Sequence, residues 1–206
     1  MQATKYLPPD YRSHKSLNLS GSRTILWLNL TAILLLFFFG WLFSYLVIKL
    51  SPINSFQTGI FGLFHSNTLI IIVAILLSII IMLVLHELTH AIFFWLFTHE
   101  FPRFSLKAGY AFTAAPEWYF PRLQYILVGL SPFLIITTAS IALTMFVAPS
   151  LIIYLLLIAA FNATGSIRDL IVVAWIFRQP MKILIKDEGD NFYTFLPFTP
   201  SPPYEQ

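Results

Sequence analysis

The segment LVLHELTHAIFFWLF (residues 83–97) carries two histidines and a glutamate inside one of the most apolar parts of the chain. Ionisable groups in the middle of a membrane helix are costly, at about 2.5–3.5 kcal/mol for the fully charged types. Such residues are kept inside an apolar span where they serve a function, such as binding a metal or a substrate. The segment therefore predicts a membrane helix with a functional site on it.

The composition supports a membrane protein. Of the 206 residues, 58% are hydrophobic and 10% are charged, whereas a soluble domain carries roughly 25% charged residues. A helix crosses a bilayer with about 20 apolar residues, and four segments are long enough: 25–49, 68–97, 123–147 and 151–177. The first is too long for a signal-peptide core of about 7–15 residues, so we expect it to be retained. The predicted fold is an all-α integral membrane protein with about four transmembrane helices.

Lysines and arginines predict the orientation of the chain. Four precede the first helix, three lie in the loop between the second and third helices, and three follow the fourth helix, whereas Lys49 alone lies at the opposite face. Because positive side chains accumulate on the cytosolic side, we expect a multi-pass protein of the cell membrane with both termini in the cytosol. The predicted domains are a cytosolic leader (1–24), a four-helix membrane domain (25–177) and a partly disordered cytosolic tail (178–206).

Residues 86–90 read H-E-L-T-H, which matches the pattern H-E-x-x-H. Positions i and i+4 share one face of a helix, so His86 and His90 can bind one zinc ion at about 2.0–2.1 Å. Glu87 lies beside the metal rather than on it, and there it can take a proton from a zinc-bound water. The simpler alternative is that both histidines only pack between helices, but unpaired polar groups inside a span are costly. We therefore predict a zinc site with Glu87 as the catalytic base.

A zinc enzyme of this type needs a third protein ligand, and the chain has no cysteine to supply it. The later candidates are His99, Glu100, Glu117 and Asp169. At 1.5 Å per residue, His86 and His90 lie about 16 and 10 Å from the cytosolic end of the second helix, and Asp169 lies about 12 Å from that end of the fourth helix. Asp169 is therefore favoured as the third ligand, ahead of Glu117 and Glu100 in the interfacial loop.

Asp169 belongs to FNATGSIRDL (residues 161–170), a polar interruption of the fourth apolar segment. Asn162, Ser166 and Asp169 are spaced by four and three residues, so they form one stripe on a helix. One interpretation is a polar stripe for helix packing, with Gly165 and Ser166 permitting close approach. A buried aspartate requires a cation more strongly, which favours a metal ligand. Asn162 lies two turns deeper, where its amide can hold a substrate carbonyl or strand.

The loop before the third helix contains RFSLKAGYAFTA (residues 103–114), in which aromatic or aliphatic residues alternate with smaller or more polar ones. This alternation has the period of a β-strand and predicts a short β-hairpin. A strand at the mouth of the site can pair with an unwound substrate backbone. A hairpin that only caps the helix bundle fits the pattern equally well.

These motifs resemble the site-2 protease group of intramembrane metalloproteases, and most closely a family of small bacterial four-helix zincin peptidases of uncharacterised function. The resemblance covers residues 68–177 and rests on H-E-L-T-H, on RLQYILVGLSPFL (residues 122–134) and on NATGSIRD (residues 162–169). In site-2 proteases an asparagine, prolines and Leu-Asp-Gly form the late motif. Here no proline follows Asn162 and Leu170 follows Asp169, so the comparison supports Asp169 more than Asn162. The resemblance implies zinc, peptide hydrolysis and membrane substrates.

The predicted function is a zinc-dependent peptidase acting in or at the membrane on membrane-embedded or membrane-associated peptides, with a cut near the cytosolic leaflet. The expected partners are such a substrate and the lipid bilayer; the modest net charge of +3 indicates no nucleic acid. The alternative is a non-catalytic membrane protein, either an inactive protease relative or a metal-site scaffold, that binds a partner helix. A transporter is disfavoured because the chain lacks a repeated half.

Overall fold

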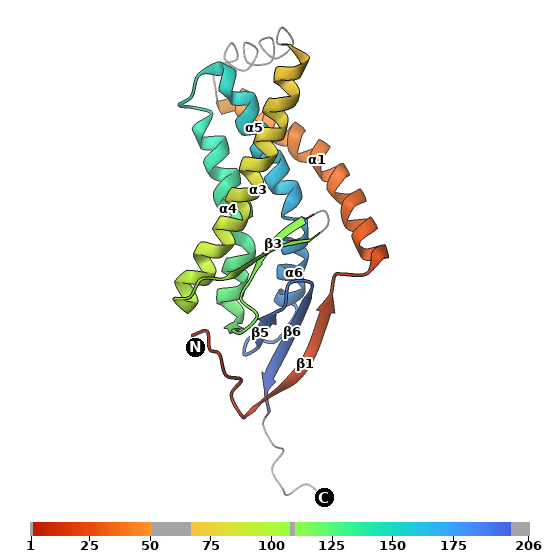
Figure 1. The fold of residues 1–206 in the computed structure, drawn as a ribbon, viewed down its shortest axis with the longest axis vertical. Coiled ribbons are helices and arrows are strands. Elements are labelled where there is room, and N and C mark those ends of the chain that lie inside the picture. The colour runs from red at the N-terminus through yellow and green to blue at the C-terminus, as the bar shows by residue number, and fades with distance from the viewer. Residues whose placement is uncertain (1, 51–66, 108–109, 199–206) are drawn as a thin grey trace, which may run out of the picture.

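The structure, a computed structural model, describes residues 2–50, 67–107 and 110–198. Among these residues the helices form a bundle that occupies one end of the molecule, and strands gather at the other end (Figure 1). The helices are α1 (Ser22–Leu50), α3 (Thr68–Thr98), α4 (Arg122–Leu143), α5 (Pro149–Gly165) and α6 (Ile167–Phe177).

Three of these helices, α1, α3 and α4, are each long and apolar enough to cross a membrane. In α1 and α3 only 11% of the most apolar stretch is buried inside the protein, so most of their apolar side chains face outward. A helix that is apolar all round and not covered by protein is suited to a lipid environment. Together with the pair α5 and α6, which counts as one bent span, the described residues offer up to four spans. This agrees with the predicted number.

The fourth predicted helix is broken rather than continuous. α5 and α6 meet at Ser166 with a bend of 44°. The Ser166 hydroxyl donates a hydrogen bond of 2.8 Å to the Asn162 carbonyl one turn earlier, and serine side chains that bond back in this way bend helices, particularly beside glycine. The break places Asp169 in the first turn of α6.

Helix α3 carries the H-E-L-T-H motif and has a defined cap at each end. Asn67 precedes the helix, and its side chain accepts a hydrogen bond of 2.9 Å from the Leu69 backbone N–H. His99 ends the helix in the left-handed conformation, with φ 56°, and donates its backbone N–H to the Trp95 carbonyl at 2.7 Å. His99 therefore acts as a helix cap.

A four-stranded antiparallel sheet covers one end of the bundle, in the order β1-β6-β5-β4. Its strands are β1 (Tyr11–Asn18), β4 (Tyr119–Pro121), β5 (Leu184–Asp187) and β6 (Asn191–Pro197). Strands β5 and β6 form a hairpin in which Leu184 pairs with Phe195, and Gly189 supplies the positive φ of 83° at its turn. Chain segments from both ends of the sequence therefore meet in one sheet.

The predicted hairpin is confirmed as β2 (Arg103–Lys107) and β3 (Tyr110–Ala114), which pair antiparallel with Arg103 opposite Ala114. Ala108, part of the predicted alternation, lies outside the described residues. In Figure 1 the hairpin crosses the bundle near the level where the helices give way to the four-stranded sheet. One strand of the hairpin contacts α3 through a hydrogen bond from Thr113 to Glu87.

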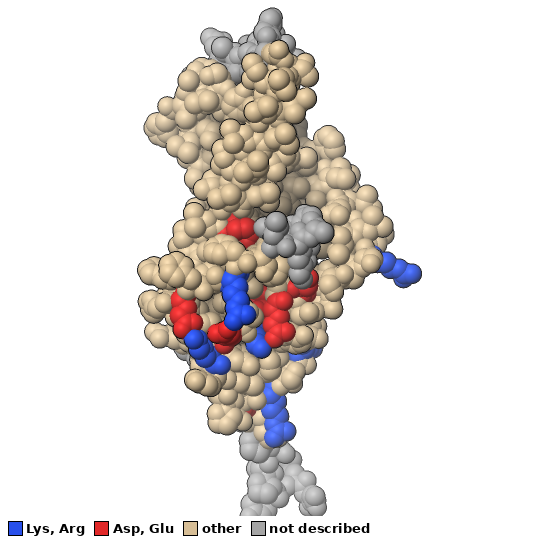
Figure 2. Space-filling model, viewed as in Figure 1, with Lys and Arg blue, Asp and Glu red and all other residues tan. Residues whose placement is uncertain are grey.

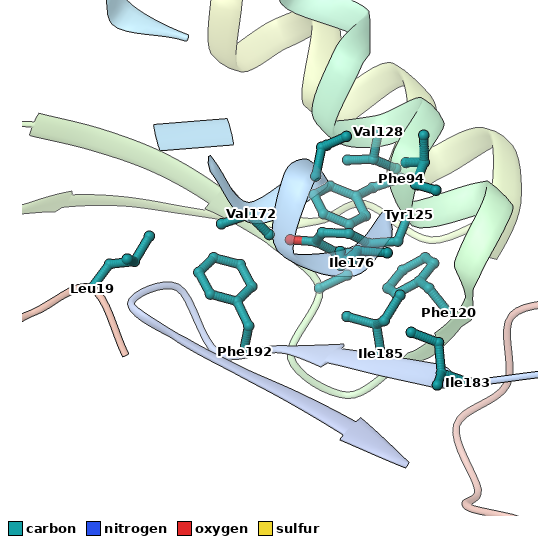
Figure 3. Packing of buried hydrophobic residues seen from close by; sticks show 13 residues of the cluster. Leu19, Phe94, Phe120, Tyr125, Val128, Val172, Ile176, Ile183, Ile185 and Phe192 are labelled. Carbon is teal, nitrogen blue, oxygen red and sulfur yellow. The ribbon is translucent and has the colours of Figure 1, made fainter. Parts of the chain in front are cut away.

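Buried apolar side chains form two clusters. In the larger, Phe120, Ile185 and Phe192 of the sheet pack with Tyr125 and other side chains from the helices (Figure 3). The smaller joins α1 to α5 through Phe43 and Val47. The sheet is thus packed onto the lower ends of α3, α4 and α6, whereas the C-terminal half of α1 holds that helix to the bundle.

The expectation of an all-α protein is wrong, because the segments read as leader and tail contribute strands to the four-stranded sheet. Strand β1 shows no apolar alternation, since five consecutive side chains are exposed; backbone pairing with β6 forms it. The tail does contain a signal: apolar runs lie on both sides of the turn sequence Glu188-Gly189-Asp190, as in a hairpin. The domain limits at 24 and 177 stay predictions, and the tip from 199 to 206 lies outside the described residues.

Candidate metal centre

Two helices bring together the three predicted metal ligands. His86 and His90 lie one turn apart on α3, and Asp169 reaches them from the first turn of α6. Asp169 Oδ2 lies 3.2 Å from His86 Nε2 and 3.5 Å from His90 Nε2. Among the described residues these three form a group whose ligand atoms all lie within 4.8 Å of one another.

The proton of the His86 ring can be placed from its neighbours. Asn162 Nδ2 lies 2.9 Å from the Pro132 carbonyl, which can only accept a hydrogen bond. The amide is thereby oriented with Oδ1 toward His86 Nδ1, at 3.1 Å. Since Oδ1 is also an acceptor, His86 Nδ1 carries the proton and donates. Nε2 is left with a lone pair directed at Asp169.

The same reasoning applies to His90. Its Nδ1 lies 3.0 Å from the Val128 backbone carbonyl, which is an acceptor only, so Nδ1 donates and Nε2 again holds the lone pair. Metal-binding histidines commonly donate their second ring nitrogen to a carbonyl or carboxylate, because this fixes the tautomer and the ring orientation. Both histidines are therefore set to bind through Nε2.

Two lone pairs and a carboxylate that face one another can hold a cation. If both rings were protonated instead, two positive rings with centroids 4.9 Å apart would lie in a site where both residues are buried. For bonds of about 2.0–2.1 Å around tetrahedral zinc, ligand atoms lie roughly 3.3 Å apart. The distances of 3.2 and 3.5 Å bracket this value, so the residues fit zinc.

Glu87 is half-buried beside this group. Its Oε2 accepts a hydrogen bond of 2.7 Å from the hydroxyl of Thr113, a buried residue of β3. The hairpin thus holds the carboxylate that the sequence assigned as catalytic base. Thr113 was not predicted as a site residue, because nothing in a strand pattern says which helix the strand will pack against.

The site opens into a cavity of about 810 Å³. One wall is α3 with His86, Glu87 and His90, and the facing wall is the N-terminal half of α1 with Leu28 and Asn29. Strand β3, α4, the end of α5, α6 and the β5–β6 hairpin also contribute to the lining. Asn162 is not part of the described lining, and its side chain is fully buried behind His86. Asn162 thus contacts His86, and its predicted contact with a substrate stays a prediction.

The other candidate third ligands are engaged elsewhere. Glu100 pairs with Lys5 at 2.6 Å and accepts a hydrogen bond from the Trp118 indole, and Glu117 pairs with Arg103. Both carboxylates lie at the surface, with side chains about half exposed. Of the candidates, only Asp169 lies within reach of both histidines in the described part of the chain.

A second polar cluster, which sequence reasoning missed, lies at the end of the cavity nearest the sheet. The Tyr125 hydroxyl donates to Asp187 Oδ2 at 2.6 Å, and the Gly189 N–H donates to Asp187 Oδ1 at 2.7 Å. Burial raises the pKa of the Asp187 carboxyl to about 6, against the lowering effect of these hydrogen bonds. Next to it, Arg168 pairs with Asp190.

Comparison with known proteins gives one match. The family model DUF3267, described as "Putative zincin peptidase", matches residues 79–184, slightly more than half of the chain. The matched region begins within α3, ends at the start of β5 and contains every residue of the metal group together with Glu87, Thr113 and Asn162. Neither the curated proteins nor the solved structures yield a match.

Proposed function

The chain belongs to the putative zincin peptidase family, and on that premise we propose that it is a zinc-dependent peptidase acting in or at the membrane on membrane-embedded or membrane-associated peptides, with a cut near the cytosolic leaflet. The observation that carries the proposal is the convergence of two Nε2 lone pairs on one carboxylate, with a glutamate beside them. A site that only stores a metal needs no such base.

In this proposal His86, His90 and Asp169 hold zinc, which when bound acts as a Lewis acid on the scissile carbonyl and acidifies the attacking water. Glu87 takes the proton from that water and delivers it to the leaving amine. The Thr113 hydroxyl donates a hydrogen bond to Oε2 of Glu87. This bond holds the carboxylate in one orientation, and Oε1 is then the oxygen that accepts the proton of the water.

We assign Asn162 the task of orienting His86, in place of the predicted contact with substrate. Its carboxamide contacts His86, the Pro132 carbonyl and the Thr137 hydroxyl within a fully buried site. Both N–H groups of this amide are used by these contacts. Second-sphere partners of this kind raise ligand basicity and fix ring orientation.

The substrate chain is proposed to lie extended in the cavity between β3 and α1. A helical peptide bond is shielded by its own hydrogen bonds, so a transmembrane substrate must unwind before it is cut. Strand β3 pairs with β2 on one edge, and its other edge can receive an extended backbone by strand addition. The apolar face of α1 that lines the cavity, which includes Ile25 and Leu28, suits the side chains of such a segment.

The decisive experiment measures zinc and peptidase activity on the same detergent-purified samples. Wild type and Glu87→Gln should each contain about one zinc per chain, and His86→Ala and Asp169→Ala should lose it. On a quenched fluorescent peptide library in detergent, Glu87→Gln should lower the rate by at least about 100-fold, the usual contribution of a general base. Glu117→Gln is the matched control, since this glutamate lies at the surface.

If wild-type protein, reconstituted with zinc after mild purification, binds none, the peptidase proposal fails. If zinc binds but Glu87→Gln cleaves as fast as wild type, Glu87 is not the base. Zinc binding without any cleavage, by wild type and variant alike across the library, would favour the metal-site scaffold that binds a partner helix.

A further inference from the structure

Pro132 lies inside α4 and is fully buried. A proline has no backbone N–H, so the carbonyl four residues earlier in the helix loses its usual hydrogen-bond donor. Here that carbonyl belongs to Val128. It accepts instead from His90 Nδ1 at 3.0 Å and from the Ser131 hydroxyl at 2.8 Å. Both lone pairs of this oxygen are therefore used by side chains.

The carbonyl of Pro132 itself has a second role. It accepts from Asn162 Nδ2 at 2.9 Å, and this contact turns Asn162 Oδ1 toward His86 Nδ1. The two histidines of H-E-L-T-H are thus oriented by two carbonyls of α4 that lie four residues apart. One of them is available only because residue 132 is a proline.

We propose that Pro132 is a positioning residue for the metal ligands: it frees the Val128 carbonyl to fix His90 in the Nδ1–H tautomer. The inference rests on the proposed zinc site, since the benefit of that tautomer is an Nε2 lone pair available for metal. A proline can also bend a helix, but a bend alone does not select the proton position on one of two rings.

Replacing Pro132 by alanine restores an N–H aimed at the Val128 carbonyl. The Val128 oxygen then has three donors for two lone pairs, so the hydrogen bond from His90 Nδ1 is lost. The Asn162 contact is kept, because alanine has the same carbonyl, so His86 should not respond. The expected effect is therefore confined to one histidine of the pair.

The first test is nitrogen NMR of histidine-labelled protein prepared without metal, which reports the tautomer of each ring. In wild type, His86 and His90 should both be Nδ1–H. In Pro132→Ala, His90 should shift toward Nε2–H and His86 should not. Pro149→Ala, at the start of α5, is the matched proline control and should leave both rings unchanged. An unchanged His90 in Pro132→Ala overturns the proposal.

The second test is zinc affinity by chelator competition. Pro132→Ala should weaken zinc binding by about 10–100-fold, as expected for the loss of an outer-shell partner, and Pro149→Ala should not. The double variant Ser131→Ala/Pro132→Ala removes one competing donor, so it should restore the His90 tautomer and most of the affinity. Failure of this rescue would show that Pro132 acts only through the shape of α4.

The two proposals fail separately. If wild-type protein binds no zinc, the proposed function is lost, yet the NMR comparison on the metal-free protein still decides whether Pro132 sets the tautomer of His90. If zinc binds but Pro132→Ala changes neither the tautomer nor the affinity, only the positioning role is lost.

Discussion

Each residue of the site owes its chemical state to a neighbour far away in the sequence. Backbone and amide oxygens from α4 and α5 place the protons on His86 and His90, and a strand hydroxyl holds Glu87. The motif supplies the functional groups, and these partners set their protonation and direction. Substitutions at the partners should therefore alter the chemistry without removing a ligand.

Thr113→Val tests this at the catalytic base. Valine keeps the shape of threonine but cannot donate to Glu87 Oε2, so the carboxylate loses a hydrogen bond worth about 1–2 kcal/mol. We expect the peptidase rate to fall by about 5–30-fold while zinc content stays at the wild-type level. Thr89→Val is the control, because the Thr89 hydroxyl bonds within α3, to the Leu85 carbonyl. An equal loss of activity in both variants would contradict a specific role for Thr113.

The buried carboxyl of Asp187 makes the stability of the folded protein depend on pH, in a direction that follows from its raised pKa. Its pKa is raised from 3.8 to about 6 by burial, so between these values the folded chain keeps a proton that the unfolded chain has lost. The contribution of this carboxyl to stability is thus complete below about pH 4 and is lost as pH rises through 6.

Asp187→Asn removes this dependence. The variant should match wild type near pH 4 and should exceed its free energy of unfolding at pH 7 by up to about 3 kcal/mol, since a tenfold change in proton affinity corresponds to about 1.4 kcal/mol. Thermal unfolding in detergent at several pH values measures the difference. Glu188→Gln, at an exposed neighbour, should follow wild type throughout. A constant difference between Asp187→Asn and wild type from pH 4 to 7 would refute the assignment.

At the scale of elements, the site depends on how closely α4 and α6 approach. A Cβ built on Gly129 would lie 2.6 Å from Val173 Cγ2 and 3.9 Å from the Asp169 carbonyl. Only glycine permits this distance between the helices, as small residues do at other close helix contacts. Gly129 of α4 therefore sets the position of the first turn of α6, which carries the third ligand.

Gly129→Ala should push α6 away, since the β-branched Val173 has no freedom to yield. We expect the variant to be destabilised by about 1–3 kcal/mol, as for other overpacked sites, and to bind zinc more weakly. Gly40→Ala is the control, because a Cβ there meets nothing within 4 Å. Melting temperature and chelator competition measure the two effects. Wild-type zinc affinity in Gly129→Ala would show that Asp169 does not depend on this contact.

At the scale of the whole molecule, the polar and apolar parts are separated along the long axis. Figure 2 shows charged side chains gathered over the sheet and hairpin end, while the helical end of the same face carries none among the described residues. Such a division suits a molecule whose helices lie in lipid and whose sheet lies in water. The metal group lies near the boundary between these parts.

Cysteine labelling in membrane vesicles tests the predicted orientation. The natural chain has no cysteine, so single substitutions give an unambiguous signal. Lys15→Cys in β1 and Lys186→Cys in β5 should react with an impermeant maleimide only from the cytosolic side, and Lys49→Cys, at the far end of α1, only from the opposite side. Labelling of Lys15→Cys and Lys49→Cys from one side would exclude a span through α1.

The sequence by itself determined the features that depend on neighbours along the chain. The length of the apolar segments predicted the spans, a spacing of four residues placed His86 and His90 on one face, and alternation predicted the β2–β3 hairpin. The helical rise of 1.5 Å per residue placed Asp169 at the same depth as the two histidines. Each of these follows from the fixed rise and period of a helix or strand, so no tertiary contact is needed to read it.

Only the tertiary structure decided the features that depend on contacts between distant segments. Pairing of β1 with β6 joins residues 11–18 to residues 191–197, and no local pattern in β1 encodes that pairing. Likewise the bonds from Thr113 to Glu87 and from His86 to Asn162 link residues 26 and 76 positions apart. A polar side chain could bond to many groups along the chain, and the packed fold selects its partners, because burial leaves only a few of those groups at bonding distance.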